Sequence, residues 1–295
     1  MNKSILVIGS TCVDLIINID HLPVTEEDIH PFSQTMALGG CAFNTANILR
    51  QTGADFTFVS PVGSGMYGDY VEKCLRQKGF PIHVKLPGEN GCCYCLVEAG
   101  GERTFLSVHG VEYSFRKEWM APFRMSDYGM VYICGLEVEE PTGEILVSWL
   151  EEHPELQIFF APGPRVASIN PERIQRLLAL SPILHINENE SRFLSGCEDI
   201  ATAACRIREM TSNTVVITLG ADGACCLETT GEPYFVPAKK AVVADTIGAG
   251  DAHIGALLSG LQRGLTMRSA IEWANEIAAR VVSVKDASLP EDEHV

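Results

Sequence analysis

The sequence is poor in positive charge and contains no long apolar segment. Its 22 Lys and Arg residues are outnumbered by 38 Asp and Glu residues, which gives a net charge of −16. Such an acidic surface disfavours nucleic acid and anionic membranes, so neither is expected as a partner. No apolar run reaches the length of a transmembrane helix, and Met1–Gly9 is better explained as a first strand than as a signal peptide.

The cysteines lack the pattern of a disulfide framework. Their number, 11, is odd, and they are scattered along the chain. This usage predicts a reducing, cytoplasmic setting. One CxxC spacing occurs in Cys92-Cys93-Tyr94-Cys95, but it has no second Cys pair and no nearby His pair, and it lies in an alternating, strand-like run. Zinc binding or redox chemistry at this motif is therefore not expected.

The motifs of several other enzyme classes are missing. The chain has no GxxxxGK[ST] phosphate loop and no GxSxG nucleophile elbow. Gly63–Gly68 fits GxGxxG, but it lies outside the first strand–helix–strand unit, and the acidic strand end that a dinucleotide site needs does not follow it. His residues are few and dispersed, and His253 is interpreted as a helix-start residue and not as a catalyst.

Strands and helices alternate along most of the chain. The 295 residues, 46% hydrophobic and 20% charged, suit one globular domain over residues 1–295. The predicted buried strands are Ile5–Ile8, Phe56–Val59, Met130–Cys134, Gln157–Ala161, Ile183–Ile186 and Val215–Leu219. The helical stretches between them are Phe43–Gln51, Asp69–Lys78, Pro141–Glu152, Pro171–Ala179 and Ile200–Met210. Antiparallel edge strands (Ala224–Glu228, Tyr234–Val236) and two helices (Ala252–Arg263, Met267–Val282) are expected near the end. This order predicts an α/β domain with a mostly parallel sheet covered on both faces.

A second group of predicted strands has one polar face. Leu15–Ile19, Cys93–Glu98 and Thr104–His109 alternate polar and apolar residues, and a hairpin turn joins the last two. These segments do not fit inside a doubly wound sheet. They predict a small separate β-sheet, built from residues of about 12–38 and 84–110, that acts as a lid over a cleft.

The most informative segment is Asp245-Thr246-Ile247-Gly248-Ala249-Gly250-Asp251, which directly precedes an apolar run. A turn of small residues that opens a helix exposes backbone N–H groups, and the helix dipole favours negative charge there. The turn Gly248–Gly250 is therefore a candidate phosphoryl site, and Asp251 can accept a proton from an attacking hydroxyl. The combination predicts a phosphoryl transferase. A Gly-rich cap on a buried helix is the structural alternative.

Other polar residues near predicted turns are candidate ligand contacts. Gly39 and Gly40 precede a helix and permit close backbone approach to a ligand. Asn44, in the first turn of that helix, offers an amide to sugar hydroxyls. Asp14 follows the first strand, at the edge of the sheet where α/β ligands bind. A turn followed by a helix cap is the alternative for the Gly39–Asn44 segment.

Two strand ends complete the set of candidates. Asn187 and Glu190 follow the strand Ile183–Ile186, where oxygen-rich side chains can hold hydrated Mg²⁺. A polar helix start, with acidic residues that complement the dipole, is the alternative. Thr218–Gly223 closes the next strand, and its glycines could let a nucleotide lie against the backbone, although a plain β-turn has the same sequence pattern.

Taken in order, these motifs resemble the ribokinase-like, or PfkB, family of carbohydrate and nucleoside kinases. The matching positions are Gly9-Ser10 with Asp14, Gly39-Gly40 with Asn44, Val62–Gly68, Gly101–Phe105, the NxxE motif at Asn187 and Glu190, and the DTxGAGD motif at Asp245–Asp251. The resemblance covers nearly the whole chain and explains the GxGxxG match better than a dinucleotide site does. It implies a ribokinase-like, three-layer α/β/α fold and transfer of the ATP γ-phosphoryl group to a hydroxyl.

The resemblance also implies a role for each matching residue. Asp251 would be the base, and Gly248, Ala249 and Gly250 would form the anion hole. The implied nucleotide contacts are Asn187, Thr218, Gly220, Gly223 and Asn275, and Mg²⁺ would be held by Asn187 and Glu190 through water. The implied acceptor contacts are Asp14, Gly39, Gly40, Asn44, Arg103 and Glu137.

The chain departs from the family pattern in two places that concern cations and the C-terminus. Asp245 matches a position that helps to bind a monovalent cation. The partner loop, Val284–Leu289, lacks Gly and is shortened, which argues against K⁺ activation. The usual last helix is also missing from the sequence. ATP and Mg²⁺ therefore remain the implied cofactors.

The charges of the lid segments favour an uncharged acceptor. A phosphosugar would need several cations around its phosphate, but the lid offers only Lys85 and Arg103 among many acidic residues. A free sugar such as ribose or fructose is therefore the expected acceptor. A phosphosugar, or a binding module without catalysis, is a further alternative.

A nucleoside is the main alternative acceptor, and a homodimer is the expected assembly. Adenosine, pseudouridine or an imidazole riboside would need an aromatic or apolar face for its base, for which Phe43, Phe105, His109 and Tyr113 are candidates. The exposed edges of a small lid sheet are adhesive unless they are covered. Pairing of two lids is the expected contact.

Overall fold

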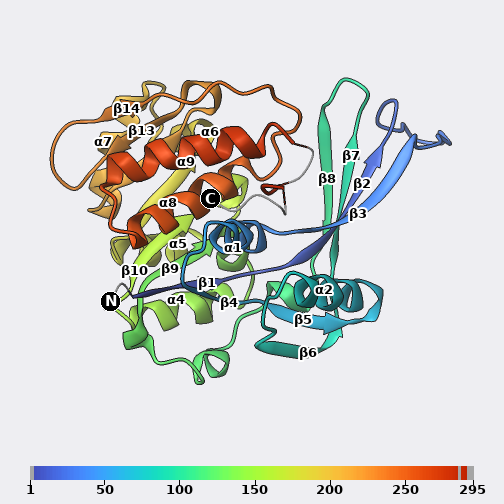
Figure 1. The fold of residues 1–295 in the computed structure, drawn as a ribbon, viewed down its shortest axis with the longest axis horizontal. Helices are drawn as coiled ribbons and strands as arrows, with labels where there is room; N and C mark the ends of the chain where they lie inside the picture. The colour runs from blue at the N-terminus through green and yellow to red at the C-terminus, as the bar shows by residue number, and fades with distance from the viewer. Residues whose placement is uncertain (1–2, 285–286, 291–295) are drawn as a thin grey trace.

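The computed structural model describes residues 3–284 and 287–290, and its centre is an eight-stranded sheet (Figure 1). The strand order is β14 (Tyr234–Val236), β13 (Ala224–Leu227), β12 (Val215–Thr218), β11 (Ile183–Asn187), β10 (Gln157–Ala161), β9 (Tyr128–Cys134), β1 (Ser4–Ile8) and β4 (Phe56–Val59). The strands from β12 to β4 pair in parallel, whereas β13 and β14 pair antiparallel. The mostly parallel sheet and its antiparallel edge are thus confirmed.

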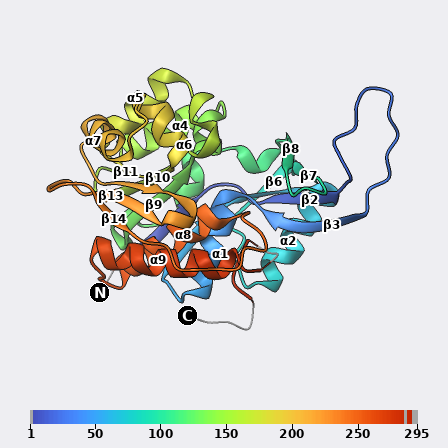
Figure 2. The same cartoon turned by 90° about the horizontal axis from the view of Figure 1, so that it is seen from above.

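Helices cover both faces of this sheet (Figure 2). One face carries α4 (Gly143–Glu151), α5 (Pro171–Ala179), α6 (Glu188–Ser195) and α7 (Ile200–Thr211), and the other carries α1 (Cys41–Gln51), α8 (Ala249–Gln262) and α9 (Met267–Val281). The short α3 (Gly135–Glu139) follows β9, and α2 (Gly65–Gln77) packs near the second sheet. Short 3₁₀ turns are η1 (Val111–Tyr113), η2 (Lys117–Met120), η3 (Met125–Asp127), η4 (Gly163–Ala167) and η5 (Gly220–Asp222). The three-layer architecture is confirmed.

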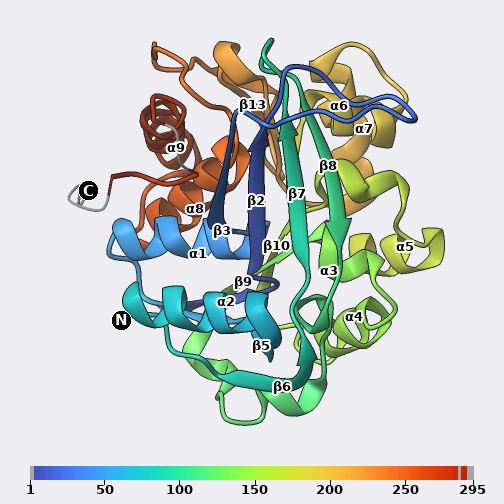
Figure 3. The ribbon, with the colours of Figure 1, turned by 90° about the vertical axis from the view of Figure 1, so that its right-hand side faces the viewer.

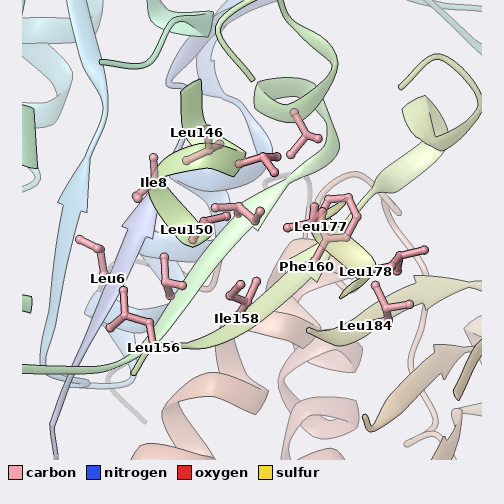
Figure 4. Packing of buried hydrophobic residues seen from close by; sticks show 14 of the residues in the cluster. Leu6, Ile8, Leu146, Leu150, Leu156, Ile158, Phe160, Leu177, Leu178 and Leu184 are labelled. Atoms are coloured by element: carbon pink, nitrogen blue, oxygen red, sulfur yellow. The ribbon is translucent and has the colours of Figure 1, made fainter. Parts of the chain in front are cut away.

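Alternate residues of the central strands pack into opposite layers, as the two-residue period of a strand requires. Leu6 and Ile8 of β1 pack in one cluster with Leu146 of α4 (Figure 4). Ile5 and Val7, on the other face of β1, belong to the cluster under α1. All five side chains are at most 3% exposed, and each such burial contributes roughly 1.5–3 kcal/mol.

A second sheet projects to one side of the main domain (Figures 1 and 3). Its strand order is β3 (Ser33–Gly39), β2 (Cys12–Asn18), β7 (Cys92–Val97) and β8 (Arg103–Val108). The inner pair, β2 and β7, is parallel, and both outer pairs are antiparallel. The predicted small separate sheet is therefore present. The two-stranded sheet of β5 (Pro61–Ser64) and β6 (Val84–Glu89) lies beneath it.

Several element predictions need correction. The strand Ser33–Gly39 was not predicted because its sequence lacks alternation, and β5 and β6 were missed because both contain Gly or Pro. Helix α8 begins at Ala249, three residues before the predicted start, because Gly248 adopts a left-handed φ of 72° and serves as the N-cap. Among the described residues, no helix has the length and apolarity needed to cross a membrane.

Candidate active site

The loop before α8 places backbone N–H groups at a helix N-terminus. Gly248 caps the helix with φ 72°, and a Cβ at this position would lie 2.5 Å from that of Ala287, so a larger residue is excluded. The first-turn amides of Gly250 and Asp251 have no helical carbonyl behind them, whereas the Ala249 amide donates to the Thr246 carbonyl at 3.3 Å. This turn therefore concentrates partial positive charge that suits a phosphoryl group.

A cavity of about 560 Å³ opens at this helix N-terminus. Ala249 and Gly250 form part of its wall. The wall also contains four residues that the sequence assigns to the nucleotide: Thr218, Gly220, Gly223 and Asn275. Three chain segments that are far apart in sequence thus meet at one cavity, at the carboxyl end of β12. Asn187, the fifth predicted nucleotide contact, is not part of this wall.

Asp251 lies in the first turn of α8 and contacts the opposite wall of the cleft. The amide nitrogen Nδ2 of Asn44 donates a hydrogen bond to Asp251 Oδ2 at 2.9 Å, across 207 positions of sequence. Burial raises the pKa of Asp251 to about 7, although the hydrogen bonds from Asn44 and Cys41 lower it. The negative charges of Asp14 and Glu137 add to the rise. A carboxylate with this pKa is suited to accept a proton near neutral pH.

The predicted acceptor contacts lie around the end of β1. Gly39 and Asp14 are close neighbours, because a Cβ on Gly39 would approach Asp14 Oδ2 to 2.1 Å. Burial raises the pKa of Asp14 to about 6. Gly40 has a φ of 101°, and a Cβ there would lie 2.7 Å from the Ser10 carbonyl oxygen. Both glycines are thus required by space or by backbone conformation.

Glu137 is the most enclosed of these carboxyl groups, with 3% exposure. Its Oε1 accepts the Ser10 amide at 2.7 Å, and its Oε2 accepts the Cys134 thiol at 2.6 Å. Burial raises the pKa of Glu137 despite these hydrogen bonds. Both carboxyl oxygens therefore accept hydrogen bonds from the protein, and through them Glu137 shapes the loop at Ser10.

Arg103 of β8 reaches from the second sheet to the loop before α8. Its Nη2 lies 2.9 Å from Asp245 Oδ1, and its Nη1 donates to Thr246 Oγ1 at 3.4 Å. The side chains of Arg103 and Asp245 are 21% and 20% exposed. Arg103 thus places a positive charge beside the carboxylate that the sequence assigned to a monovalent cation. Lys285 and Asp286, in the loop expected to complete that cation site, lie outside the described residues.

Asn187 and Glu190 form a capping box at the start of α6. Asn187 Oδ1 accepts the Glu190 amide at 2.9 Å, and Glu190 Oε2 accepts the Asn187 amide at 3.0 Å. Asn187 Nδ2 also donates to Glu190 Oε1 at 2.6 Å. Direct coordination of Mg²⁺ would break this cap. The pair therefore fits contact with a hydrated Mg²⁺ through water, the mode that this ion commonly uses.

A buried chain of polar side chains, missed from the sequence, runs behind the cavity. His185 Nε2 lies 2.8 Å from His253 Nδ1, and His253 Nε2 lies 3.1 Å from Asn275 Oδ1. Asn275 Nδ2 donates to the carbonyls of Val236 and Pro237, both at 3.1 Å. These partners fix the amide orientation, so His253 donates from Nε2 and His185 donates from Nε2.

Burial keeps both histidines neutral. It lowers the pKa of His253 to about 4, and it lowers the pKa of His185 well below the usual range with help from the neighbouring imidazole. His253 also lines the cavity, so it is more than the helix-start residue that was predicted. Because the Asn275 amide is fully used, this residue shapes the cavity wall with its polar atoms turned to the protein.

Lys239 and Lys240 are two further cavity residues that sequence reasoning missed. They are exposed and lie between β14 and α8. The sequence did contain an indication of this role, because an adjacent Lys pair just before the Asp245–Asp251 segment is unusual in an acidic chain. Two cations at the rim of the cavity favour an anionic ligand.

The ribokinase-like class of kinases is defined by a three-layer α/β/α domain with a second, smaller sheet beside the cleft. Its site combines an anion-binding helix N-terminus with a nearby carboxylate. The pfkB family carbohydrate kinase pattern matches residues 2–294. The chain therefore belongs to the pfkB family of carbohydrate kinases and is a kinase.

Two curated relatives and one solved structure illustrate the similarity. The uncharacterized sugar kinase YegV of Escherichia coli (strain K12) is 32% identical over 286 residues, which cover 95% of this chain and 88% of that protein. The aminoimidazole riboside kinase of Salmonella typhimurium is 28% identical and covers 97% of this chain and 91% of its own. The crystal structure of ribokinase from Thermotoga maritima matches with a TM-score of 0.85 at 22% identity, covering 98% of this chain and 96% of that chain.

Proposed function

We propose that this kinase transfers the γ-phosphoryl group of ATP to a hydroxyl of a free sugar such as ribose or fructose. The position of Asp251 carries the proposal. On one side it adjoins Ala249 and Gly250, which line the 560 Å³ cavity. On the other side it bonds to Asn44 and senses the charges of Asp14 and Glu137. A nucleotide in the cavity and a polyol beside Asp14 would meet at Asp251.

The chemistry follows from this placement. Asp251 accepts the proton of the acceptor hydroxyl, and the hydroxyl oxygen attacks the γ-phosphorus. The bond between the γ-phosphorus and the oxygen that bridges it to the β-phosphate breaks, and ADP leaves. The amides of Gly248–Gly250 stabilise the negative charge on the transferred group. Mg²⁺ bound with ATP would supply positive charge to the phosphates, and Asn187 and Glu190 would hold it through water. Thr218, Gly220 and Gly223 would lie along the nucleotide.

The ion pairs of the lid region support an uncharged acceptor. Lys85 binds Glu72, and Arg103 is held by Asp245. The two cations that a phosphosugar could use are therefore already engaged by carboxylates. Asp14 and Asn44 offer hydroxyl-binding groups, which suit a polyol, and Glu137, whose oxygens already accept bonds from Ser10 and Cys134, stays a proposed contact through its remaining lone pairs. Arg103 would lie between the nucleotide and the acceptor, and it remains a proposed contact of either substrate.

A nucleoside acceptor is the second candidate, and one aromatic side chain favours it. Phe105 of β8 is 53% exposed and lies on the same face of the second sheet as Arg103. It could cover a base that sits above the ribose. Phe43 and Tyr113 are 3% and 7% exposed, so they are core residues and offer little stacking surface. His109 stacks on Tyr113 and binds Glu140.

We also propose that the second sheet is a lid and that two lids pair in a homodimer. Exposed apolar side chains on the sheet and its loops support this assembly: Val24, Phe32, Leu106 and Val108 are 55–70% exposed. Strands β3 and β8 are sheet edges with unpaired backbone groups, which commonly seek a partner.

ADP release from MgATP tests the kinase proposal across free sugars, sugar phosphates and nucleosides, with and without K⁺. Turnover on one free sugar, abolished in Asp251→Asn, is the expected result. Turnover confined to a nucleoside would replace the sugar with the second candidate. Turnover on sugar phosphates alone would contradict the argument from Lys85 and Arg103.

A further inference from the structure

A cluster of two thiols and one carboxylate lies on a single face of the second sheet. Cys93 and Cys95 are two residues apart on β7, so their side chains share one face, and their sulfur atoms lie 3.8 Å apart. Asp14 is the direct neighbour of Cys93 across the parallel β2–β7 pair. One ligand atom from each of the three residues lies within 4.8 Å of the other two.

These distances match a tetrahedral metal site. Two thiolates bound at about 2.3 Å to one zinc ion, at the tetrahedral angle, are separated by about 3.8 Å. We propose that Asp14, Cys93 and Cys95 bind a thiophilic divalent cation such as Zn²⁺, with a fourth position open to water or a hydroxyl. Among the described residues, no other group of His, Cys, Asp or Glu has this geometry.

The surroundings of the cluster support a built site. Ser107 Oγ lies 3.5 Å from Cys93 Sγ, and Cys12 Sγ lies 3.6 Å from Asp14 Oδ1, so both ends of the cluster have polar neighbours. Cys95 is 1% exposed, whereas Cys93 and Asp14 are half-buried. An ion can therefore reach the partly exposed ligands Cys93 and Asp14 from solvent and still be held next to a buried thiol.

The site uses a different cysteine pair from the CxxC spacing in the sequence. Cys92 and Cys95 are three residues apart on a strand, so their side chains point to opposite faces and cannot share an ion. Cys93 and Cys95 can share one, and only the strand register reveals Asp14 as the third ligand. The sequence expectation against zinc considered the CxxC spacing, the missing second Cys or His pair and the strand-like run, and none of these brings in Asp14.

A consequence for catalysis rests on the proposed function. Asp14 is the proposed contact to an acceptor hydroxyl, so a cation on Asp14 would compete with the sugar and not with ATP. Zn²⁺ is then expected to raise KM for the sugar in proportion to its concentration while kcat stays unchanged. The thiols would thereby make acceptor binding sensitive to thiophilic metals.

Direct binding tests the site on the full-length, reduced, metal-free protein. Zn²⁺ is titrated against a chromophoric chelator, and Cd²⁺ is added separately to follow the ultraviolet thiolate-to-metal band. One ion per chain is expected, with affinity lowered by about 100-fold or more in Cys93→Ser and in Cys95→Ser. Cys197→Ser, which alters another half-buried free thiol, is the matched control and should bind like the wild type.

Each result is decisive. Absent binding, or equal affinity in the wild type and both serine variants, would overturn the site. Thermal melting shows whether the variants fold, and a variant that melts like the wild type but loses the Cd²⁺ band supports the site. A Cd²⁺ band in a protein without turnover on any acceptor would keep the metal site and reject the proposed function. Turnover without a Cd²⁺ band would keep the proposed function and reject the metal site.

Discussion

Arg103 of the second sheet and Asp245 of the loop before α8 form an ion pair with a 2.9 Å contact between Nη2 and Oδ1. The pair joins the tip side of the β7–β8 hairpin to the segment that ends in Asp251. The hairpin of the second sheet and the loop that leads to the anion-binding turn are therefore linked through two side chains that are only about one-fifth exposed.

Arg103→Ala should separate the hairpin from this loop. We expect kcat/KM for the sugar to fall about tenfold or more, with little change in melting temperature, because a charge-assisted contact is lost at the cleft. Arg124→Ala is the control, since Arg124 forms an exposed ion pair with Asp127 before β9. Steady-state kinetics of the wild type and both variants check this, and wild-type kinetics in Arg103→Ala would contradict the linkage.

Asp251→Asn should abolish turnover and stabilise the fold. We expect kcat to drop by about 10²–10⁴-fold, because the acceptor proton loses its base. The folded-state pKa of about 7 exceeds the ordinary 3.8, so the free energy of unfolding falls as pH rises through this window. The amide of the variant does not ionise, so it avoids the cost of a buried charge. The variant should therefore have a higher melting temperature than the wild type above pH 7. Calorimetry and ADP release give the two measurements, with exposed Asp69→Asn as control.

The pH profile should report Asp251 and respond to Asn44. Because the base must be ionised, kcat/KM should fall as pH drops below about 7. The hydrogen bond from Asn44 lowers the pKa of Asp251, so Asn44→Ala should shift the acidic limb to higher pH, besides raising KM for the sugar. Rates measured from pH 5 to pH 9 check this. An unshifted profile in Asn44→Ala would remove the assigned role of that hydrogen bond.

His253→Phe should loosen the wall of the nucleotide cavity. The change leaves His185 and Asn275 without their hydrogen-bond partner, at a cost of about 1–3 kcal/mol for each unsatisfied group. The free energy of unfolding, measured with a denaturant, should fall, and KM for ATP should rise. His185→Phe is the matched variant, since it touches the same chain but does not line the cavity. It should lower stability with a smaller effect on KM, and equal KM effects would contradict a direct role of His253.

The same histidines predict a pH dependence of stability. Their depressed pKa values mean that the unfolded chain binds protons that the folded chain does not, so stability falls as pH drops from about 6.5 to about 4. Asp14 and Asp251 act in the opposite direction in this range, because their pKa values are raised. The wild-type slope is thus partly cancelled. The difference between the wild type and His253→Phe, measured at pH 7 and pH 5, isolates the histidine contribution.

Leu106→Lys combined with Val108→Lys should disrupt the proposed homodimer. Both side chains lie on one face of the edge strand β8 and are more than half exposed, so a buried Lys pair would be costly at an interface. Light scattering after gel filtration should show a monomer. Phe235→Lys, at an exposed position of β14, an edge strand of the eight-stranded sheet, is the control. A wild-type monomer would contradict the assembly itself.

The motifs of the sequence predicted much of the site because they fall at chain reversals whose position the fold determines. The end of β12 lies at the carboxyl edge of the parallel strands, where ligands of α/β sheets bind. Gly39-Gly40 ends the antiparallel strand β3 of the second sheet, and Gly248–Gly250 opens α8 after the antiparallel edge strand β14. Contacts between side chains could not be predicted in the same way. The bond from Asn44 to Asp251 spans 207 positions, and no local pattern encodes it.

Residues with two possible explanations were the hardest to assign. The sequence pattern of Asn187 and Glu190 is typical of both a metal site and a helix cap, and the structure has the cap, which leaves contact with Mg²⁺ through water as a proposal. His253 looked like a lone residue because its partner, His185, belongs to a distant strand. Ser33–Gly39 shows no alternation, since it is an edge strand whose burial increases steadily from Ser33 to Gly39 and which has few apolar residues to mark it.

The chain enters and leaves the second sheet twice, because its strands come from two separate segments. β2 is hydrogen-bonded to β3 on one side and to β7 on the other. A protease cut in the exposed loop between Asp20 and Phe32 would therefore divide the polypeptide without freeing either fragment. The two fragments of the cleaved protein should stay associated in the same fold. This loop is therefore a suitable site for inserting a label or a fused domain.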